Sequence, residues 1–306
     1  MLDPAELVTF VSEPADLDAP VLLVSLTGFI DAGGGGRLVK EHLLTSFENS
    51  LVATFDVDQV FDYRARRPSM LFIQDHWESY DDPGLALHAI RDTAGTGFLL
   101  LEGAEPDVQW ERFISAVTSL VERFGVRLTV GVHGIPMAVP HTRPVGITAH
   151  GTRPELTSGH QAWIDTVQVP GSAQNLLELR LGQAGHDAVG FAAHVPHYVA
   201  DATFPAGAIA LLEAVSAATG LQLAAALLAD ADRDTRAALD QQVAASEEIG
   251  SVVTTLESQY DAFVAARDRG LLAPEGQPLP TGDELGAELE RFLAEEARRN
   301  DGRESP

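Results

Sequence analysis

The sequence predicts an α/β protein. Short, nearly continuous apolar runs, as in VLLVSL at residues 21–26 and FLLL at 98–101, are expected of strands buried on both faces of a sheet. Longer segments with apolar residues at helical spacing alternate with these runs, which is the pattern of an α/β fold. The 306 residues can bury one large core, or a core with a smaller satellite.

The first half of the chain alternates strands and helices behind a glycine-rich turn. The first predicted strand, 21–26, is followed by a turn at 27–36 and a helix at 37–47. Gly125 is expected to close a later amphipathic helix at 110–124. The further predicted strands of this half are 51–56, 70–74, 85–90, 98–101 and 127–132.

The second half continues the alternation and then changes character. Helices at 173–183 and 206–219 flank a predicted strand at 188–195, so the sheet is expected to run from residue 21 to about residue 199. Residues 221–306 contain 18 acidic residues and 8 arginines and show no convincing strand. We therefore divide the chain into an α/β core domain, 1–220, and a helical C-terminal subdomain, 221–306, with a frayed tail.

Two apolar patterns support helices in this C-terminal region. One stripe recurs at helical spacing, and Thr281 with Glu284 forms a capping box for a last helix. The stripe consists of Ile249, Val252, Leu256, Tyr260 and Phe263, and the last helix would carry Leu285, Leu289, Phe292 and Leu293.

Composition excludes several classes of function. A formal net charge of −25 would repel nucleic acid and anionic membranes from most of the surface. No run approaches the roughly 18 uncharged apolar residues of a membrane span. The absence of cysteine removes disulfides and thiolate chemistry, and the acidic N-terminus does not resemble a signal peptide, so we expect a cytoplasmic protein. Lys40 is the only lysine that could act as a base or form a Schiff base.

The turn at residues 27–36 (TGFIDAGGGG) allows two interpretations. A strand, a glycine-rich turn and a helix start together can bind an anion through free backbone N–H groups. Asp31 argues against phosphate, because a carboxylate at the mouth repels an anion unless it caps the helix. Gly33 and Gly34 could instead let the strand and the helix pack closely, which is the interpretation that we favour.

Other polar residues follow predicted strands and could form a pocket. Strand ends in an α/β sheet gather their loops at one edge, so we expect these residues to share a crevice. The histidines that follow prolines are held in stiff, non-helical segments and more often serve structure than catalysis. The candidates are Asp31, Gly33, Gly34, Glu102, Glu105, His141, Thr142, Arg143, His194, His197 and Tyr198.

No metal or cofactor is expected at this pocket. No histidine pair has the i, i+4 spacing of a zincin helix, and no Gly-x-Ser-x-Gly elbow is present. If Arg143 is structural, we expect its guanidinium to pair with Glu102 or Glu105.

Two features could contact a partner. Arg64, Arg66 and Arg67 form the densest basic cluster in the first half of the chain, and they either make salt bridges in a loop or bind an acidic surface. Trp77 and Tyr80 are expected to cover a sheet edge or a subunit interface.

Several strings in order make the sequence resemble the bacterial branch of the proteasome assembly chaperone 2 family. They are GFIDAGG (28–34), DYRARRP (62–68), LLEGAEPDVQW (100–110), PHTRP (140–144), VPHYV (195–199) and LLEAV (211–215). The resemblance covers most of the chain, from about residue 21 to residue 223. It implies a phosphorylase/hydrolase-like mixed sheet with helices on both faces, a helical C-terminal region, and self-association, which we expect to give a homotrimer.

The resemblance implies an interaction protein more than an enzyme. Relatives in eukaryotes and archaea help proteasome subunits assemble and commonly end in a hydrophobic-Tyr-any tripeptide, whereas this chain ends Glu304-Ser305-Pro306. Docking to the proteasome through such a tripeptide is therefore not expected. The family resemblance, the acidic surface, the helical C-terminal region and the lack of a complete catalytic motif lead us to expect a non-enzymatic oligomer, with a proteasome-related or another protein partner. The alternative is a small-ligand-binding protein or a hydrolase/phosphorylase-type enzyme that uses the strand-end crevice. An ATP-grasp ligase is disfavoured, since Lys40 is the only lysine available for phosphates.

Overall fold

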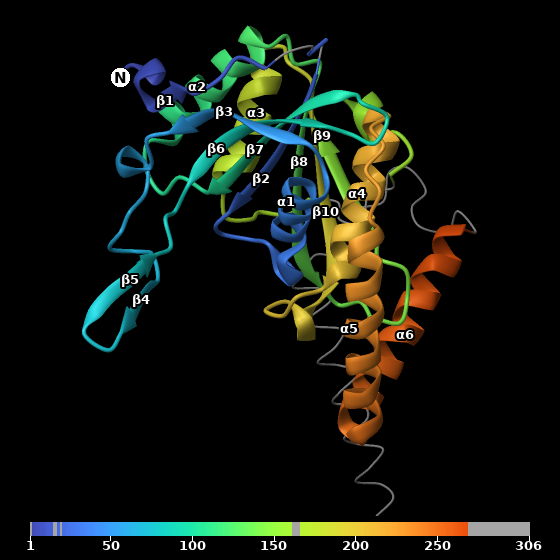
Figure 1. Ribbon diagram of the computed structural model, residues 1–306. Helices are drawn as coiled ribbons and strands as arrows, with labels where there is room; N and C mark the ends of the chain where they lie inside the picture. The colour runs from blue at the N-terminus through green and yellow to red at the C-terminus, as the bar shows by residue number, and fades with distance from the viewer. Residues whose placement is uncertain (1, 15–16, 19, 161–165, 269–306) are drawn as a thin grey trace, which may run out of the picture. The chain divides into compact units, whose positions relative to one another are not determined.

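The computed structural model describes residues 2–14, 17–18, 20–160 and 166–268 (Figure 1). An eight-stranded sheet contains β1 (Val8–Phe10), β2 (Val21–Thr27), β3 (Asn49–Phe55), β6 (Leu85–Arg91), β7 (Gly97–Ala104), β8 (Leu128–Met137), β9 (Ile147–Gly151) and β10 (Ala188–Pro196). The helices are α1 (Gly35–Ser46), α2 (Trp110–Arg123), α3 (Ala173–Gln183), α4 (Pro205–Thr219), α5 (Ala226–Ala245) and α6 (Glu247–Asp268). A separate two-stranded sheet consists of β4 (Met70–Ile73) and β5 (His76–Tyr80).

The main sheet is mixed, as expected, and its strand order is β1-β3-β6-β7-β2-β8-β10-β9. The four central strands, β7, β2, β8 and β10, run parallel to one another. The flanking pairs are antiparallel: β6 with β7, β3 with β6, β1 with β3, and β9 with β10. The carboxyl ends of the central strands therefore meet at one edge of the sheet.

Helices cover both faces of this sheet, because successive residues of a buried strand point to opposite faces. Leu23 of β2 packs in a core with Val39 and Leu43 of α1 and with Leu211 of α4. Leu22 and its same-face neighbours pack instead against α2 and α3. Figure 1 shows α1 and α4 on one face of the sheet and α2 and α3 on the other.

The prediction of a strand at residues 70–74 was right in type, but its assignment to the main sheet was wrong. Met70–Ile73 pairs with His76–Tyr80 in a β-hairpin that shares no ladder with the eight-stranded sheet. Every residue of both strands is exposed. Trp77, expected to cover an edge or an interface, lies in β5 and packs on Phe72 with their ring centroids 5.0 Å apart.

Two strands of the main sheet were not predicted from the sequence. β1 has three residues and β9 has the partly polar sequence ITAHG, so neither shows a clear apolar period. Both lie at the edges of the sheet, where a strand needs only one neighbour. Their identity as strands therefore depends on pairing with β3 and β10, far away in the sequence.

Residues 221–268 are helical beyond a short connection, as predicted. α5 packs on α4, and α6 contains the whole predicted apolar stripe. Among the side chains of α6 up to residue 266, Val253 and Leu256 are buried, whereas Ile249 and Val252 are each 45% exposed, so the first turn of the predicted stripe does not face the core.

Contacts divide the described residues into two units. The sheet and the helices as far as Tyr260 form one unit, and residues 166–167 and 261–268 belong to the second. The boundary that we placed at residue 220 remains a proposal. The predicted capping box at Thr281 and Glu284, the last helix and the tail lie outside the described residues. None of the helices in the described part of the chain is long and apolar enough to span a membrane.

Candidate functional site

The loop that follows β2 is hydrogen-bonded to β8 and to the segment after β10 at the carboxyl edge of the sheet. Asp31 follows β2, and its Oδ1 accepts a hydrogen bond from the backbone N–H of Gly134 in β8 at 3.0 Å. Gly33 N–H donates to the carbonyl of Ala200, just past β10, at 2.7 Å. The structure therefore brings together several of the strings that resemble the family.

Asp31 caps the start of α1. Its Oδ1 also accepts from Gly36 N–H at 2.8 Å, and its Oδ2 accepts from Arg37 N–H at 3.0 Å. Gly33 and Gly34 precede the helix with φ of +66° and +64°, a left-handed conformation that glycine adopts without the strain of a side chain. These three candidates fit the packing interpretation of the turn, and the carboxylate is already surrounded by backbone donors.

Glu105 has a similar role on the other face of the sheet. Its Oε2 accepts from Phe29 N–H at 2.9 Å, and its Oε1 accepts from Ala173 N–H, at the first residue of α3, at 2.6 Å. A carboxylate at this position is favoured by the helix dipole. A side chain at Gly28 would collide with this carboxylate, which explains the glycine there.

Glu102 lies apart from Glu105, on the face covered by α1. Its carboxylate is 3.5 Å from Lys40 Nζ and 3.3 Å from His88 Nε2. Burial disfavours ionisation of Glu102, but the hydrogen bond from His88 and the charge of Lys40 outweigh it, so the pKa of Glu102 is lowered. The two glutamates of the EGAEP string therefore do not form a pair.

His141 is buried and contacts Tyr198, in a short 3-10 helix after β10, and Asp240 of α5. Its Nδ1 lies 2.7 Å from the hydroxyl of Tyr198, which also accepts from His141 N–H at 2.8 Å, and its Nε2 lies 3.4 Å from Asp240 of α5. His197, in contrast, is exposed and stacks edge-on with Tyr198. Of these candidates, the structure joins His141 to Tyr198 and leaves His197 at the surface.

Arg143 binds α6, so the expectation that it pairs with Glu102 or Glu105 was wrong. Its Nη1 lies 3.1 Å from Glu257, and the Thr142 hydroxyl donates to the same carboxylate. Tyr260 of α6 also donates to the carbonyl of Pro144 at 3.1 Å. The PHTRP loop therefore binds this part of α6 through side-chain hydrogen bonds and an ion pair. These contacts join segments more than 100 residues apart in the sequence.

The three arginines of the basic cluster have different environments. Arg66 donates to the carbonyls of Thr27 and Glu105 and pairs with Asp107 at 2.8 Å, so it ties the base of the hairpin to the strand ends. Arg64 and Arg67 are exposed. Arg66 is therefore structural, whereas a contact of Arg64 and Arg67 with a partner stays a prediction.

A crevice opens where β2 and β8 separate. Their ladder runs from Val21 opposite Leu128 to Val24 opposite Gly131 and then stops, although both strands continue. The side chain of Gln174 fills the gap, since its Oε1 accepts from Leu26 N–H at 3.4 Å and its Nε2 donates to the carbonyl of Val132 at 3.5 Å.

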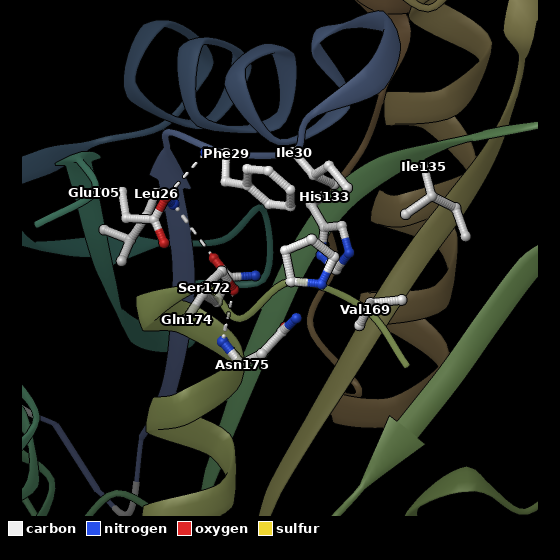
Figure 2. Close-up of a pocket in the computed structure, with 11 residues that line it drawn as sticks. Leu26, Phe29, Ile30, Glu105, His133, Ile135, Val169, Ser172, Gln174 and Asn175 are labelled. Atoms are coloured by element: carbon white, nitrogen blue, oxygen red, sulfur yellow. Dashed lines mark hydrogen bonds between the residues drawn. The ribbon is translucent and has the colours of Figure 1, made fainter. Parts of the chain in front are cut away.

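The crevice has a cavity volume of about 110 Å³ (Figure 2). Its lining is mainly apolar and includes a few polar groups on α3 and β8. The lining residues are Leu26, Phe29, Ile30, Glu105, His133, Ile135, Val169, Pro170, Ser172, Gln174 and Asn175.

Sequence reasoning found only Glu105 among these residues. Ser172 could have signalled the site, because it is a helix N-cap that accepts from Asn175 N–H and so places Gln174 and Asn175 in the first turn of α3. His133 directly follows the strand predicted at 127–132, but nothing else in the sequence distinguishes it from a structural histidine.

The fold and the strand-end strings agree with the comparisons with known proteins. The model of the PAC2 family matches residues 25–243, and the chain belongs to this family. A Mycobacterium tuberculosis protein of unknown function is 49% identical, with 88% of this chain and 93% of that chain covered and a TM-score of 0.84. A Corynebacterium glutamicum protein of unknown function is 35% identical, covering 85% of this chain and 98% of that one, with a TM-score of 0.81.

A more distant structure shares the fold. A proteasome-assembly chaperone homologue from M. tuberculosis is 22% identical, with 76% of this chain and 99% of that chain covered and a TM-score of 0.70. No curated protein matches the sequence.

Proposed function

We propose that this protein is a homo-oligomeric, non-enzymatic interaction protein with a chaperone-like role, and that the β4–β5 hairpin mediates its self-association. The hairpin is the single observation that carries this proposal. Membership of the PAC2 family and the fold shared with a proteasome-assembly chaperone homologue support it.

The hairpin exposes a large apolar surface, although it shares no hydrogen-bonded ladder with the main sheet. Six large apolar or aromatic residues on it are between 40% and 62% exposed, and isolated two-stranded hairpins are marginally stable at best. Contiguous exposed apolar surface of this kind marks interaction sites. The six residues are Met70, Leu71, Phe72, Ile73, Trp77 and Tyr80.

Charge favours a second copy of this chain as the occupant. Arg64 and Arg67 are exposed just before the hairpin, on a protein with a net charge of −25. These cations would be attracted to the acidic surface of another subunit, while the apolar strands supply the buried area. We propose a homotrimer, as the family resemblance implies.

The partner of the assembled oligomer is proposed to be proteasome-related or another multi-subunit protein. The cytoplasm remains the compartment that we expect for this role. The purified protein should accelerate the assembly of proteasome α- and β-subunits from the same cells, followed by native electrophoresis. Equal assembly rates with and without it would contradict the proteasome-related role and leave self-association to be judged separately.

Self-association is tested by the mass in solution. Light scattering on the wild type should give about three times the 32.6 kDa mass of one chain, and the double variant Phe72→Ala/Trp77→Ala should give a smaller species. Leu227→Ala is the control, because Leu227 is 62% exposed on α5, away from the hairpin. A wild-type monomer, or a double variant with unchanged mass, would refute the role of the hairpin.

The alternative is a ligand-binding protein or an enzyme, and the crevice between β2 and β8 supports the first of these. Binding has more support than catalysis. The two carboxylates at this edge, Asp31 and Glu105, each accept backbone hydrogen bonds on both oxygens, so neither is poised as a base.

A further inference from the structure

The crevice between β2 and β8 occurs at a switch point of the sheet. The chain leaves β2 to form α1 on one face, whereas the chain beyond β8 continues through β9 to α3 on the other face. In α/β sheets, ligands bind outside the carboxyl ends of the strands where neighbouring connections diverge in this way. The inserted Gln174 keeps the two strand ends apart without leaving their backbone groups unpaired.

The walls of the crevice suit a single flat ring. A dry apolar cavity of about 150 Å³ can hold benzene, and the space here is about 110 Å³. Phe29 is 53% exposed at its rim and Val169 is 60% exposed. A ring that enters the crevice could therefore stack on Phe29 and extend slightly beyond the enclosed space.

Two side chains in the crevice offer unused polar groups. The amide of Asn175 and the imidazole of His133 make no hydrogen bond to any other described residue, and Figure 2 shows both at the same crevice as Phe29. Burial, with a smaller effect from His150, lowers the pKa of His133 to about 4. The ring is thus neutral near pH 7 and can both donate and accept a hydrogen bond.

The charges exclude ionic ligands. No arginine or lysine lines the crevice, so an anion has no counter-charge among the lining residues. The Glu105 carboxylate would repel an anion, and its backbone donors already neutralise much of its attraction for a cation. Burying an unpaired charge in such a mainly apolar site is costly.

We propose that the crevice between β2 and β8 binds a small, uncharged, single-ring molecule with an amide-like edge that carries both a donor and an acceptor. Phe29 provides the stacking surface, Asn175 pairs with the amide-like edge, and His133 supplies one further hydrogen bond. This site does not depend on the proposed role of the hairpin, which has its own test.

Benzamide and benzoate form the probe pair, because they have nearly the same shape and differ in charge. In saturation-transfer NMR near pH 7, benzamide should bind the full-length protein with a Kd of about a millimolar, as its size allows. Benzoate should bind at least about tenfold more weakly. Absence of benzamide binding at millimolar concentrations, or equal binding of benzoate, would overturn the proposal.

Variants locate the binding. Asn175→Leu should weaken benzamide binding by about tenfold, as expected for the loss of a hydrogen bond, and Phe29→Ala should weaken it severalfold. Leu227→Ala is the control, since Leu227 is 62% exposed on α5 and does not line the crevice. Circular dichroism confirms that each variant is folded, and Asn175→Ser replaces Asn175→Leu if the latter is not.

Each remaining outcome is decisive. Loss of affinity in the crevice variants alone supports the proposal. Unchanged affinity in both crevice variants, or an equal loss in Leu227→Ala, refutes it. A monomeric wild type that still binds benzamide in the crevice would reject the hairpin proposal and leave the ligand site standing.

Discussion

At the scale of single residues, the candidate polar side chains mostly hold segments together. The ion pair of Arg143 shows why the contribution of such a contact to stability depends on its exposure to solvent. Its side chain and that of Glu257 are 30% and 27% exposed, so solvent screens the pair and its contribution is about 1 kcal/mol or less. Removing one partner of a buried pair would cost about 3–5 kcal/mol, because the remaining charge would be buried without a partner.

Arg143→Ala should therefore change the global stability little and loosen the hold on α6. Hydrogen exchange of the amides between Glu247 and Tyr260 should become faster, while amides of the central strands remain protected. Arg233→Ala is the control, because its pair with Asp230 is more than 70% exposed on both sides. Equal exchange rates in the two variants would contradict a specific contact between the PHTRP loop and α6.

Two histidines, His133 and His194, should make stability depend on pH. Burial lowers the pKa values of His133 and His194 to about 4, with His150 adding to the effect on His133. The unfolded chain, with histidine pKa values near 6.5, binds more protons than the folded chain below that pH. Stability should therefore be highest above pH 6.5 and fall towards pH 4, by up to about 1.4 kcal/mol per pH unit for each histidine.

Urea unfolding between pH 7 and pH 4.5 measures this slope. His133→Phe should reduce the slope by the share of one histidine, because His194 is then the only one of the two with a lowered pKa. A slope that is the same in His133→Phe and the wild type would show that His133 is not held neutral by the fold.

At the scale of elements, the start of α1 depends on one side chain. Asp31 receives three backbone N–H groups, two from α1 and one from β8, and thereby connects the helix to the sheet. Gly134 lies so close to the carbonyl of Ala32 that a side chain there would collide with it. The turn, the helix and β8 therefore form one tightly packed junction.

Asp31→Ala should cost about 2–3 kcal/mol of unfolding free energy, because it removes a helix cap and leaves buried donors unpaired. Asp31→Asn should recover part of this, since its carbonyl oxygen can still accept. Denaturant unfolding of the two variants measures the difference. A loss below about 0.5 kcal/mol for Asp31→Ala would mean that water replaces the carboxylate without cost.

At the scale of the whole molecule, two effects determine self-association: the net charge disfavours it and the apolar hairpin favours it. Subunits that each carry a net charge of −25 repel one another, while the apolar strands of the hairpin attract. Salt weakens the repulsion, since the Debye length falls from about 30 Å at 0.01 M to about 8 Å at 0.15 M.

The oligomer should therefore become tighter as salt rises over this range, as followed by sedimentation at low protein concentration. The double variant Arg64→Glu/Arg67→Glu should be weaker at low salt, because it replaces attractive cations with further negative charge. An oligomer that dissociates as salt is added would indicate an interface dominated by ion pairs rather than by the hairpin.

Local patterns predicted much of the fold. Buried runs such as 21–26 and 98–101 were recognised as strands because burial on both faces requires apolar residues at every position. The strand predicted at 70–74 was assigned to the wrong sheet, since its apolar residues look like those of a core strand although they are exposed. The site was less predictable: Asp31 and Glu105 stand out in the sequence, but Gln174 and His133 gain their roles only from contacts across the sheet.

By itself, the sequence determined the α/β class, the family strings and the acidic charge, because these follow from local period and composition. Only the tertiary structure decided which polar residues meet. The Glu102 side chain in β7 points towards α1 and contacts Lys40. Glu105, just past the end of β7, instead contacts the start of α3. Arg143 pairs with Glu257 because α6 packs on the PHTRP loop. Such pairings depend on strand order and helix placement, which bring together residues distant in the chain and have no signature in local spacing.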